Sequence, residues 1–127
     1  MSTGPSVRDV RVLDRTELAP GVVLLGFYAP ELVAVTRPGQ FVMAIPPAGE
    51  RAATALAIYE AQGERASFLF FVCGARTREL AELRAGDTLS ITGPLGNGFT
   101  LDRARDVAIV AGGVGIASVL LVAQRRI

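Results

Sequence analysis

Short β-type segments separated by proline and glycine turns occupy most of the chain before Gly74, and this pattern limits the fold more than any other feature. The clearest are residues 21–30 and 64–74, which are rich in the aliphatic and aromatic side chains typical of strands. Phe68 to Cys73 are almost all apolar, so we expect this strand to be buried on both faces. The other strand-like segments are residues 6–13, 37–47, 54–61 and 87–94.

Two segments have a different pattern. Residues 77–87 predict a short helix with Thr77 as its N-cap and an end near Gly86. Residues 105–127 predict a buried strand, a glycine turn and a helix. The expected fold is therefore mainly β: an antiparallel Greek-key barrel of about six strands with one short helix, followed by a strand–helix unit. A strand and apolar helix of this kind normally belong to a parallel sheet with further strands.

The composition excludes several classes of function. The chain has 127 residues, with 13 basic and 12 acidic side chains and a net charge of +1, which gives no electrostatic reason to expect a nucleic-acid partner. It has no histidine and one cysteine, Cys73, so a histidine-based triad is excluded. A metal site or an iron–sulfur cluster would lack ligands, and we predict neither. No carboxylate stands out as catalytic, and we expect Cys73 to be a packing residue.

The same features bear on location. A lone cysteine fits a reducing compartment, and residues 1–10 have no apolar signal core, so we expect a cytoplasmic protein. Val107 to Ala123 carry no charge over 17 residues, which is the lower limit for a membrane span. Glycines interrupt this run early and its first half is β-branched, so we predict a strand and a helix rather than a membrane anchor.

The first candidate phosphate loop lies between a strand and the expected short helix. Gly74 would allow close backbone approach, Thr77 offers a hydroxyl at a helix start, and Arg76 could add positive charge. The alternative is that Thr77 only caps the helix, as threonine often does.

The second candidate is the loop that contains Gly112, Gly113 and Gly115. A glycine turn between a buried strand and a helix is the geometry that holds a pyrophosphate. The G-x-G-x-x-G spacing is incomplete, because Ser118 takes the last place.

A third glycine-rich segment, GPLGNGFTL, covers Gly93 to Leu101. Gly96, Asn97 and Gly98 readily adopt left-handed backbone conformations. Phe99 could belong to the core or could offer a stacking surface for a planar ring.

Three segments, RPGQFVMAIP, VCGARTRELAELRAGDTLSITGPLGNGF and VAIVAGGVGIASVLLVAQ, follow one another in an order that resembles the ferredoxin reductase-like flavoproteins. The resemblance is strongest to the branch that holds the electron-transfer subunit of dihydroorotate dehydrogenase and the gamma subunits of NAD-linked hydrogenases. It implies an FAD-binding barrel at residues 1–103. It also implies that residues 104–127 are the first strand and helix of a truncated NAD(P)-binding domain.

The resemblance also implies roles for individual residues. Gly74, Arg76 and Thr77 would hold the flavin pyrophosphate, while Gly112, Gly113 and Gly115 would face the nicotinamide nucleotide. In many members, a strand that lines the flavin reads Arg-Pro, then an aromatic or aliphatic residue, then Ser, and here Thr54, Ala55, Leu56 and Ala57 take those places. Arg51 could replace the missing arginine only if the strand were shifted. Gly96, Asn97, Gly98 and Phe99 form the segment most characteristic of the branch, and we expect them to be among the cofactor-binding residues.

Two functions follow from these observations. In the first, the chain is an electron-transfer flavoprotein module that binds FAD and passes electrons from NAD(P)H to a partner subunit, although NAD(P) binding is not expected of so short a second domain. In the second, the chain is a flavin-free relative that serves as a scaffold or assembly protein. An exposed apolar helix at Ile116 to Ala123 would then form a homo-oligomer through the C-terminal strand–helix unit.

Overall fold

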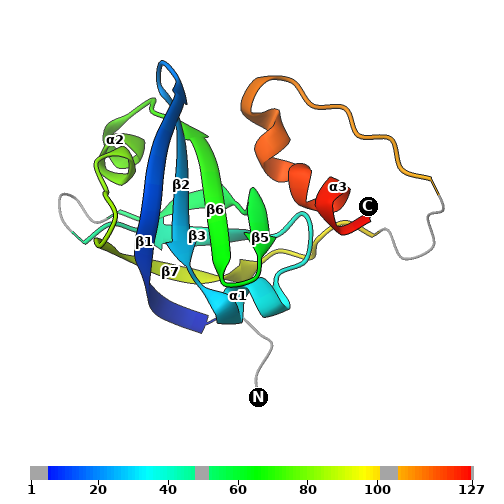
Figure 1. The fold of residues 1–127 in the computed structure, drawn as a ribbon, viewed down its shortest axis with the longest axis horizontal. Helices are drawn as coiled ribbons and strands as arrows, with labels where there is room; N and C mark the ends of the chain where they lie inside the picture. Colours follow the sequence, from blue (N-terminus) through cyan, green and yellow to red (C-terminus); the bar gives the residue numbers. More distant parts are fainter. Residues whose placement is uncertain (1–5, 48–51, 101–105, 127) are drawn as a thin grey trace.

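The computed structural model describes residues 6–47, 52–100 and 106–126 of the chain. A seven-stranded antiparallel sheet dominates it and folds back on itself, so that β3 and β7 cross behind β1, β2 and β6 (Figure 1). The strands are β1 (Ser6–Ala19), β2 (Val22–Tyr28), β3 (Phe41–Ile45), β4 (Thr54–Ala57), β5 (Glu60–Gln62), β6 (Arg65–Phe71) and β7 (Thr88–Leu95). The helices are α1 (Pro30–Val35), α2 (Ala75–Ala81), the 3-10 helix η1 (Gly113–Ser118) and α3 (Leu120–Arg126).

The strand order is β4-β3-β7-β1-β2-β6-β5, so the two edge strands follow each other in the chain. Between them, the Tyr59 amide donates to the Ser67 carbonyl at 2.9 Å, which ties the edge segment to β6. The long strand β1 pairs with β7 through Ser6–Arg11 and with β2 through Arg11–Ala19, with a register irregularity after Val12. Such an irregularity bends a strand from one part of a sheet into the next. The predicted antiparallel barrel is confirmed, with seven strands because residues 54–61 divide into β4 and part of β5.

Apolar side chains from the inner face of every strand fill the barrel. The Phe27 and Phe68 rings, from β2 and β6, lie 4.6 Å apart between centroids and form the centre of this core. Ser67, Phe68 and Leu69 are all at least nine-tenths buried, although successive residues of a strand point to opposite faces. The expected burial on both faces is therefore confirmed for Phe68 to Phe70, whereas Phe71 is 47% exposed and Cys73 is exposed as well.

The C-terminal unit departs from the sequence-based expectation. Residues 106–112 form no strand, and none of the described strands pairs with them. The predicted strand is wrong because an isolated β-rich segment has no neighbour to accept its backbone hydrogen bonds. The expected boundary between residues 103 and 104 lies outside the described residues.

The C-terminal helix is also not the bare apolar helix that the sequence suggested. It lies beside β5, on the side of the barrel away from α2 (Figure 1). Leu121 is 1% exposed and belongs to the main core, and Val122 and Ala117 are also buried. An apolar face of this kind gains more from packing on the barrel than from contact with water. In the part of the chain that the structure describes, no helix has the length and hydropathy needed to cross a membrane.

Candidate cofactor site

A pocket of about 410 Å³ opens where β4 meets the start of α2. It is lined by Thr54 from β4 and by the continuous segment Cys73 to Thr77. Thr54, Gly74, Arg76 and Thr77 were predicted from two separate motifs, and the fold brings them together in one place. Cys73 and Ala75 complete the lining. Cys73 directly precedes the segment Gly74 to Thr77 and Ala75 lies within it, and this position is the sequence signal that could have found them.

Thr77 shapes this pocket from inside the helix. The N-cap is Gly74, so the prediction that Thr77 is the N-cap is wrong by three residues. The Thr77 hydroxyl accepts the backbone N–H groups of Cys73 at 2.9 Å and Gly74 at 3.1 Å. It also lies 3.2 Å from the Gly74 carbonyl, to which it can donate. Its hydrogen-bonding capacity is thus used by the chain itself, and Thr77 holds the turn that forms the pocket.

Two other residues that line the pocket carry hydrogen-bond donors. The Arg76 guanidinium makes a long bond of 3.4 Å from Nη1 to the Ala53 carbonyl, which draws it toward β4. The Thr54 hydroxyl is buried and has no hydrogen-bond partner among the described residues. A buried hydroxyl normally has a partner, because leaving it unpaired is costly. A cation and an unpaired hydroxyl at one pocket suit an anionic ligand with several acceptor oxygens.

Cys73 corrects another expectation. It was expected to be a packing residue at the end of a buried strand, but its thiol is free and exposed. The strand β6 ends at Phe71, and the chain has already left the barrel at Cys73. Its sulfur lies 3.9 Å from the Thr77 hydroxyl, at the edge of the pocket.

The remaining residues of β4 do not line this pocket. Leu56 pairs with Val42 and packs into the core at 8% exposed, whereas Ala57 pairs with Phe41 and points to the other face. Thr54 and Leu56 lie on the same face of β4. Thr54, the first residue of the strand, lines the pocket, whereas Leu56 packs into the core. Arg51 lies outside the described residues.

The loop at Gly96 to Phe99 is built against a turn of the barrel. Gln40 Nε2 donates to the Gly96 carbonyl at 2.9 Å, and the Phe99 amide donates to the Pro38 carbonyl at 2.8 Å. Gly96 and Gly98 both have positive φ, 84° and 74°, which confirms the left-handed conformations expected of this segment. Asn97 is exposed.

Phe99 itself is 41% exposed, so it is not a core residue. Its ring and amide lie so close to Gly39 that a Cβ there would approach the Phe99 nitrogen to 2.9 Å. The loop does not contribute to the pocket at α2. The positive φ angles of Gly96 and Gly98 allow the loop to make this contact with the turn. From the sequence alone, this role of the glycines could not be distinguished from close approach of the backbone to a ligand.

The glycine loop at residues 112–115 lies on the opposite side of the barrel from α2 (Figure 1). Gly112 and Gly115 are exposed, and a 3-10 helix begins at Gly113, which has φ of 55°. Since residues 106–112, the described part of the chain before this loop, form no strand, the strand–turn–helix geometry that favoured a pyrophosphate is not present there. The structure does not bring Gly112, Gly113 and Gly115 together with the pocket residues.

Comparison with known proteins decides the family. A 93-residue stretch is 44% identical to the dihydroorotate dehydrogenase B (NAD(+)) electron transfer subunit of Clostridium acetobutylicum, covering 69% of this chain and 37% of that protein. The subunit of the same name from Desulforamulus reducens is 34% identical over 124 residues, covering 93% of this chain and 47% of that protein. No protein-family model matches the chain.

Solved structures agree. The ferredoxin reductase of carbazole 1,9a-dioxygenase superposes with a TM-score of 0.81 at 21% identity, covering 95% of this chain and 38% of that one. An NADH-dependent reduced ferredoxin-NADP oxidoreductase superposes with a TM-score of 0.67 at 26% identity, covering 72% of this chain and 34% of that one. The chain belongs to the ferredoxin reductase-like proteins, on the branch of these electron transfer subunits. It spans less than half the length of the curated relatives it matches.

Flavin is bound by at least one such structure: a ferredoxin NADP+ reductase from Neisseria gonorrhoeae, with a TM-score of 0.61, was solved with bound FAD and NADP. The pocket at α2 has room for a small anionic group. Its volume is at the lower end of ligand pockets, and its donors come from a cation and a hydroxyl. This fits a diphosphate better than a whole flavin.

Proposed function

We propose that this chain is an FAD-binding electron-transfer module and that the FAD diphosphate occupies the pocket between β4 and α2. The observation that carries the proposal is the meeting of Thr54 and Arg76 at this pocket, from segments 22 positions apart in the sequence. The Thr54 hydroxyl has no partner among the described residues, and a phosphate oxygen would supply one. The homology to electron transfer subunits supports the same assignment.

Each residue of the pocket has a separate task in this proposal. Arg76 compensates phosphate charge, and Thr54 donates a hydrogen bond from the opposite wall. Thr77 keeps the turn of Cys73 and Gly74 in shape. FAD would supply the redox chemistry, because the flavin ring exchanges hydride and electrons and the protein binds and orients it. Where relatives carry a serine, Ala57 offers no hydroxyl, so one hydrogen bond of about 1 kcal/mol to the flavin would be lost.

Binding of FAD to purified protein tests this proposal directly. We expect a flavin absorbance band, or its recovery when FAD is added to colourless protein. Arg76→Gln should weaken FAD binding about tenfold to a hundredfold, since a charge-assisted contact is lost. Thr54→Val should weaken it about tenfold while leaving the unfolding free energy nearly unchanged, because the hydroxyl has no partner in the described chain to lose.

Arg84→Gln is the matched control, because Arg84 is exposed and does not line the pocket. Isothermal titration calorimetry with FAD would compare the affinities of Arg76→Gln, Thr54→Val and Arg84→Gln. Equal affinity in all three would contradict the assignment of the pocket. Protein that stays colourless and binds no added FAD would favour the flavin-free scaffold instead, although the exposed helix expected for that function is covered by the barrel.

The wider electron-transfer activity is part of the same proposal. In it, electrons from NAD(P)H reach FAD and pass to a partner subunit, as the name of the relatives suggests. We propose that these 127 residues do not hold NAD(P) by themselves, because the glycine loop lacks a preceding strand in the described structure. The absence of an iron–sulfur cluster stays a prediction.

We also propose a homo-oligomer, but through a different part of the C-terminal unit. The helix is covered, whereas Ile109 and Val110 are 40% and 94% exposed in a segment with no strand partner. If residues 107–111 of two copies paired as β-strands, the backbone N–H and C=O groups of this segment would gain hydrogen-bond partners. Sedimentation velocity at micromolar concentration should show a species larger than 13.3 kDa, and a monomer would contradict this part of the proposal.

A further inference from the structure

A second pocket lies on the side of the barrel where α3 packs, away from the pocket at α2 (Figure 1). Its volume is about 510 Å³, which is within the range of small-molecule sites. Helix α1, helix α3 and the turn between β5 and β6 form its walls. The lining residues are Val33, Ala61, Gln62, Gly63, Gln124 and Arg125. None of them belongs to the motifs that predicted a cofactor site.

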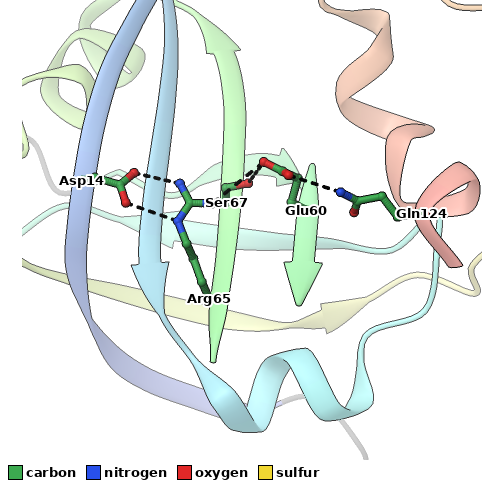
Figure 2. A network of polar contacts seen from close by, with 5 residues as sticks. All are labelled: Asp14, Glu60, Arg65, Ser67 and Gln124. Carbon is green, nitrogen blue, oxygen red and sulfur yellow. Dashed lines mark hydrogen bonds and ion pairs between the residues drawn. The ribbon is translucent and has the colours of Figure 1, made fainter. Parts of the chain in front are cut away.

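Gln124 brings an unpaired polar atom to the wall of this pocket. Its Nε2 donates to Glu60 Oε2 at 3.2 Å, and Figure 2 shows the amide oxygen turned away from that carboxylate. This oxygen, Oε1, is buried and has no hydrogen-bond partner among the described residues. A buried amide oxygen normally accepts a hydrogen bond, because leaving it unpaired costs free energy. A ligand with an N–H group would supply the missing donor.

Glu60 determines which end of the Gln124 amide faces the sheet. A carboxylate only accepts hydrogen bonds, so it selects the amide nitrogen and not the oxygen. Glu60 is itself held in place, since its Oε1 lies 3.4 Å from the Ser67 hydroxyl and 3.8 Å from Arg65 Nη1. Turning the amide round would set its oxygen against the carboxylate. The donor for Gln124 Oε1 must therefore come from elsewhere.

Arg125 and two apolar residues set the other requirements for a ligand. Arg125 Nη1 donates to the Thr36 carbonyl at 2.7 Å, and its Nη2 lies 3.4 Å from the Val33 carbonyl. A guanidinium has five N–H groups, so donors remain for an acceptor oxygen on a ligand. Val33 and Ala61 add apolar surface, which suits an uncharged ring or alkyl group.

We propose that this pocket binds a small ligand of the carboxamide type, with an apolar body, an N–H donor for Gln124 Oε1 and a carbonyl acceptor for Arg125. Primary amides and ring lactams belong to this class. The site shares no residue with the pocket at α2, so the proposal does not depend on FAD binding.

Titration of the isotope-labelled full chain with benzamide, followed by proton–nitrogen correlation spectra, tests the site. Benzamide carries an apolar ring, N–H donors and a carbonyl. We expect it to bind with a Kd of about 1 mM, as suits so small a ligand, and to shift the signals of the Ala61 and Gly63 amides and of the Gln124 side-chain NH₂ group. N,N-dimethylbenzamide keeps the ring and the carbonyl but has no N–H group, so it should bind about tenfold more weakly.

Two variants test the role of Gln124 in this preference. Gln124→Met keeps the length of the side chain but has no amide, so it should bind the two compounds with equally weak affinity. Glu60→Gln allows the Gln124 amide to face the sheet with either end, and the preference should fall to about threefold or less. Arg84→Gln, at an exposed position outside the pocket, is the control and should keep the tenfold preference.

The wild-type protein alone can overturn the proposal. Equal affinity for benzamide and N,N-dimethylbenzamide would do so, because the unpaired oxygen would then not accept a hydrogen bond from the ligand. Spectral changes confined to residues 73–77 would place benzamide at α2 instead. An unchanged spectrum at about 20 mM benzamide, roughly twentyfold above the expected Kd, would show that the pocket does not bind this class. A preference that persists in Gln124→Met would also contradict the assignment.

Discussion

The Thr77 side chain shows how one hydroxyl can organise a turn. It accepts two backbone N–H groups, from Cys73 and Gly74, at the point where the chain leaves β6 and enters α2. The sequence identified the residue and its place near a helix start, but it assigned the hydroxyl to a cap or to a ligand. Which role applies depends on where the helix begins, because only a residue at the N-cap position caps it. The sequence alone leaves a helix start uncertain by a few residues.

Thr77→Val tests this role at the residue scale. Valine has nearly the same shape but no acceptor, so two amides lose their partner, and the free energy of unfolding should fall by about 1–2 kcal/mol. Thr77→Ser keeps the hydroxyl and should stay within about 0.5 kcal/mol of the wild type. Urea denaturation of the three proteins would measure the difference. A valine variant as stable as the wild type would show that water replaces the hydroxyl without cost.

Gly26 marks a limit of residue-scale prediction. The Arg65–Asp14 pair passes directly over this position of β2, and a Cβ there would lie 2.4 Å from Arg65 Nη2 and 2.6 Å from Asp14 Oδ1. The hydrogen bond to Asp14 also raises the pKa of Arg65, against the opposing effect of burial. From the sequence, Gly26 was only a glycine inside a strong strand pattern. Its reason lies in two side chains from neighbouring strands, which no local pattern contains.

At the scale of elements, the strands were predictable because their apolar residues are consecutive or alternate over several positions. The division of residues 54–61 into β4 and β5 was not, because it depends on which edge each half pairs with. Helix α1 was missed although Pro30 at its first position and Glu31 in its first turn are both typical of helix starts. Six residues are too few for a helical period to stand out from the strand before it and the turn after it.

The candidate site was predictable in its parts and not in its assembly. Gly74, Arg76 and Thr77 were recognised from one motif, and Thr54 was recognised only through the family resemblance. Their meeting at one pocket follows from the pairing of β4 with β3 and from the direction in which β6 leads into α2. The loops at Gly96 and Gly112 were assigned to ligands by the same glycine-based argument. The structure shows that one of them is shaped by a turn contact and that the other lacks its strand.

At the scale of the whole molecule, the barrel and its C-terminal helix form one packed unit, joined by an exposed connection. The prediction of a bare helix failed because the sequence records that a face is apolar but not which surface covers it. Here the covering surface includes the main core, through Leu121, and the carbonyls of α1, through Arg125. In the described residues, the helix of the predicted second domain therefore packs on the barrel, and the division of the chain at residue 104 stays a prediction.

Cutting the connection tests this view of the molecule. At a concentration low enough to keep the protein monomeric, thermolysin, which cleaves before large apolar residues, should attack near Ile109 and Val110, which are then exposed and unpaired with any described strand. A denaturing gel should then show two fragments, whereas native mass spectrometry should show them together, because burial of Leu121 and the bonds of Arg125 still hold the helix. The same digestion of Arg125→Gln provides the comparison, since the weakened helix should be lost more readily. Release of the C-terminal fragment from the wild-type protein at once would mean that the connection, and not the packing of the helix on the barrel, keeps α3 in place.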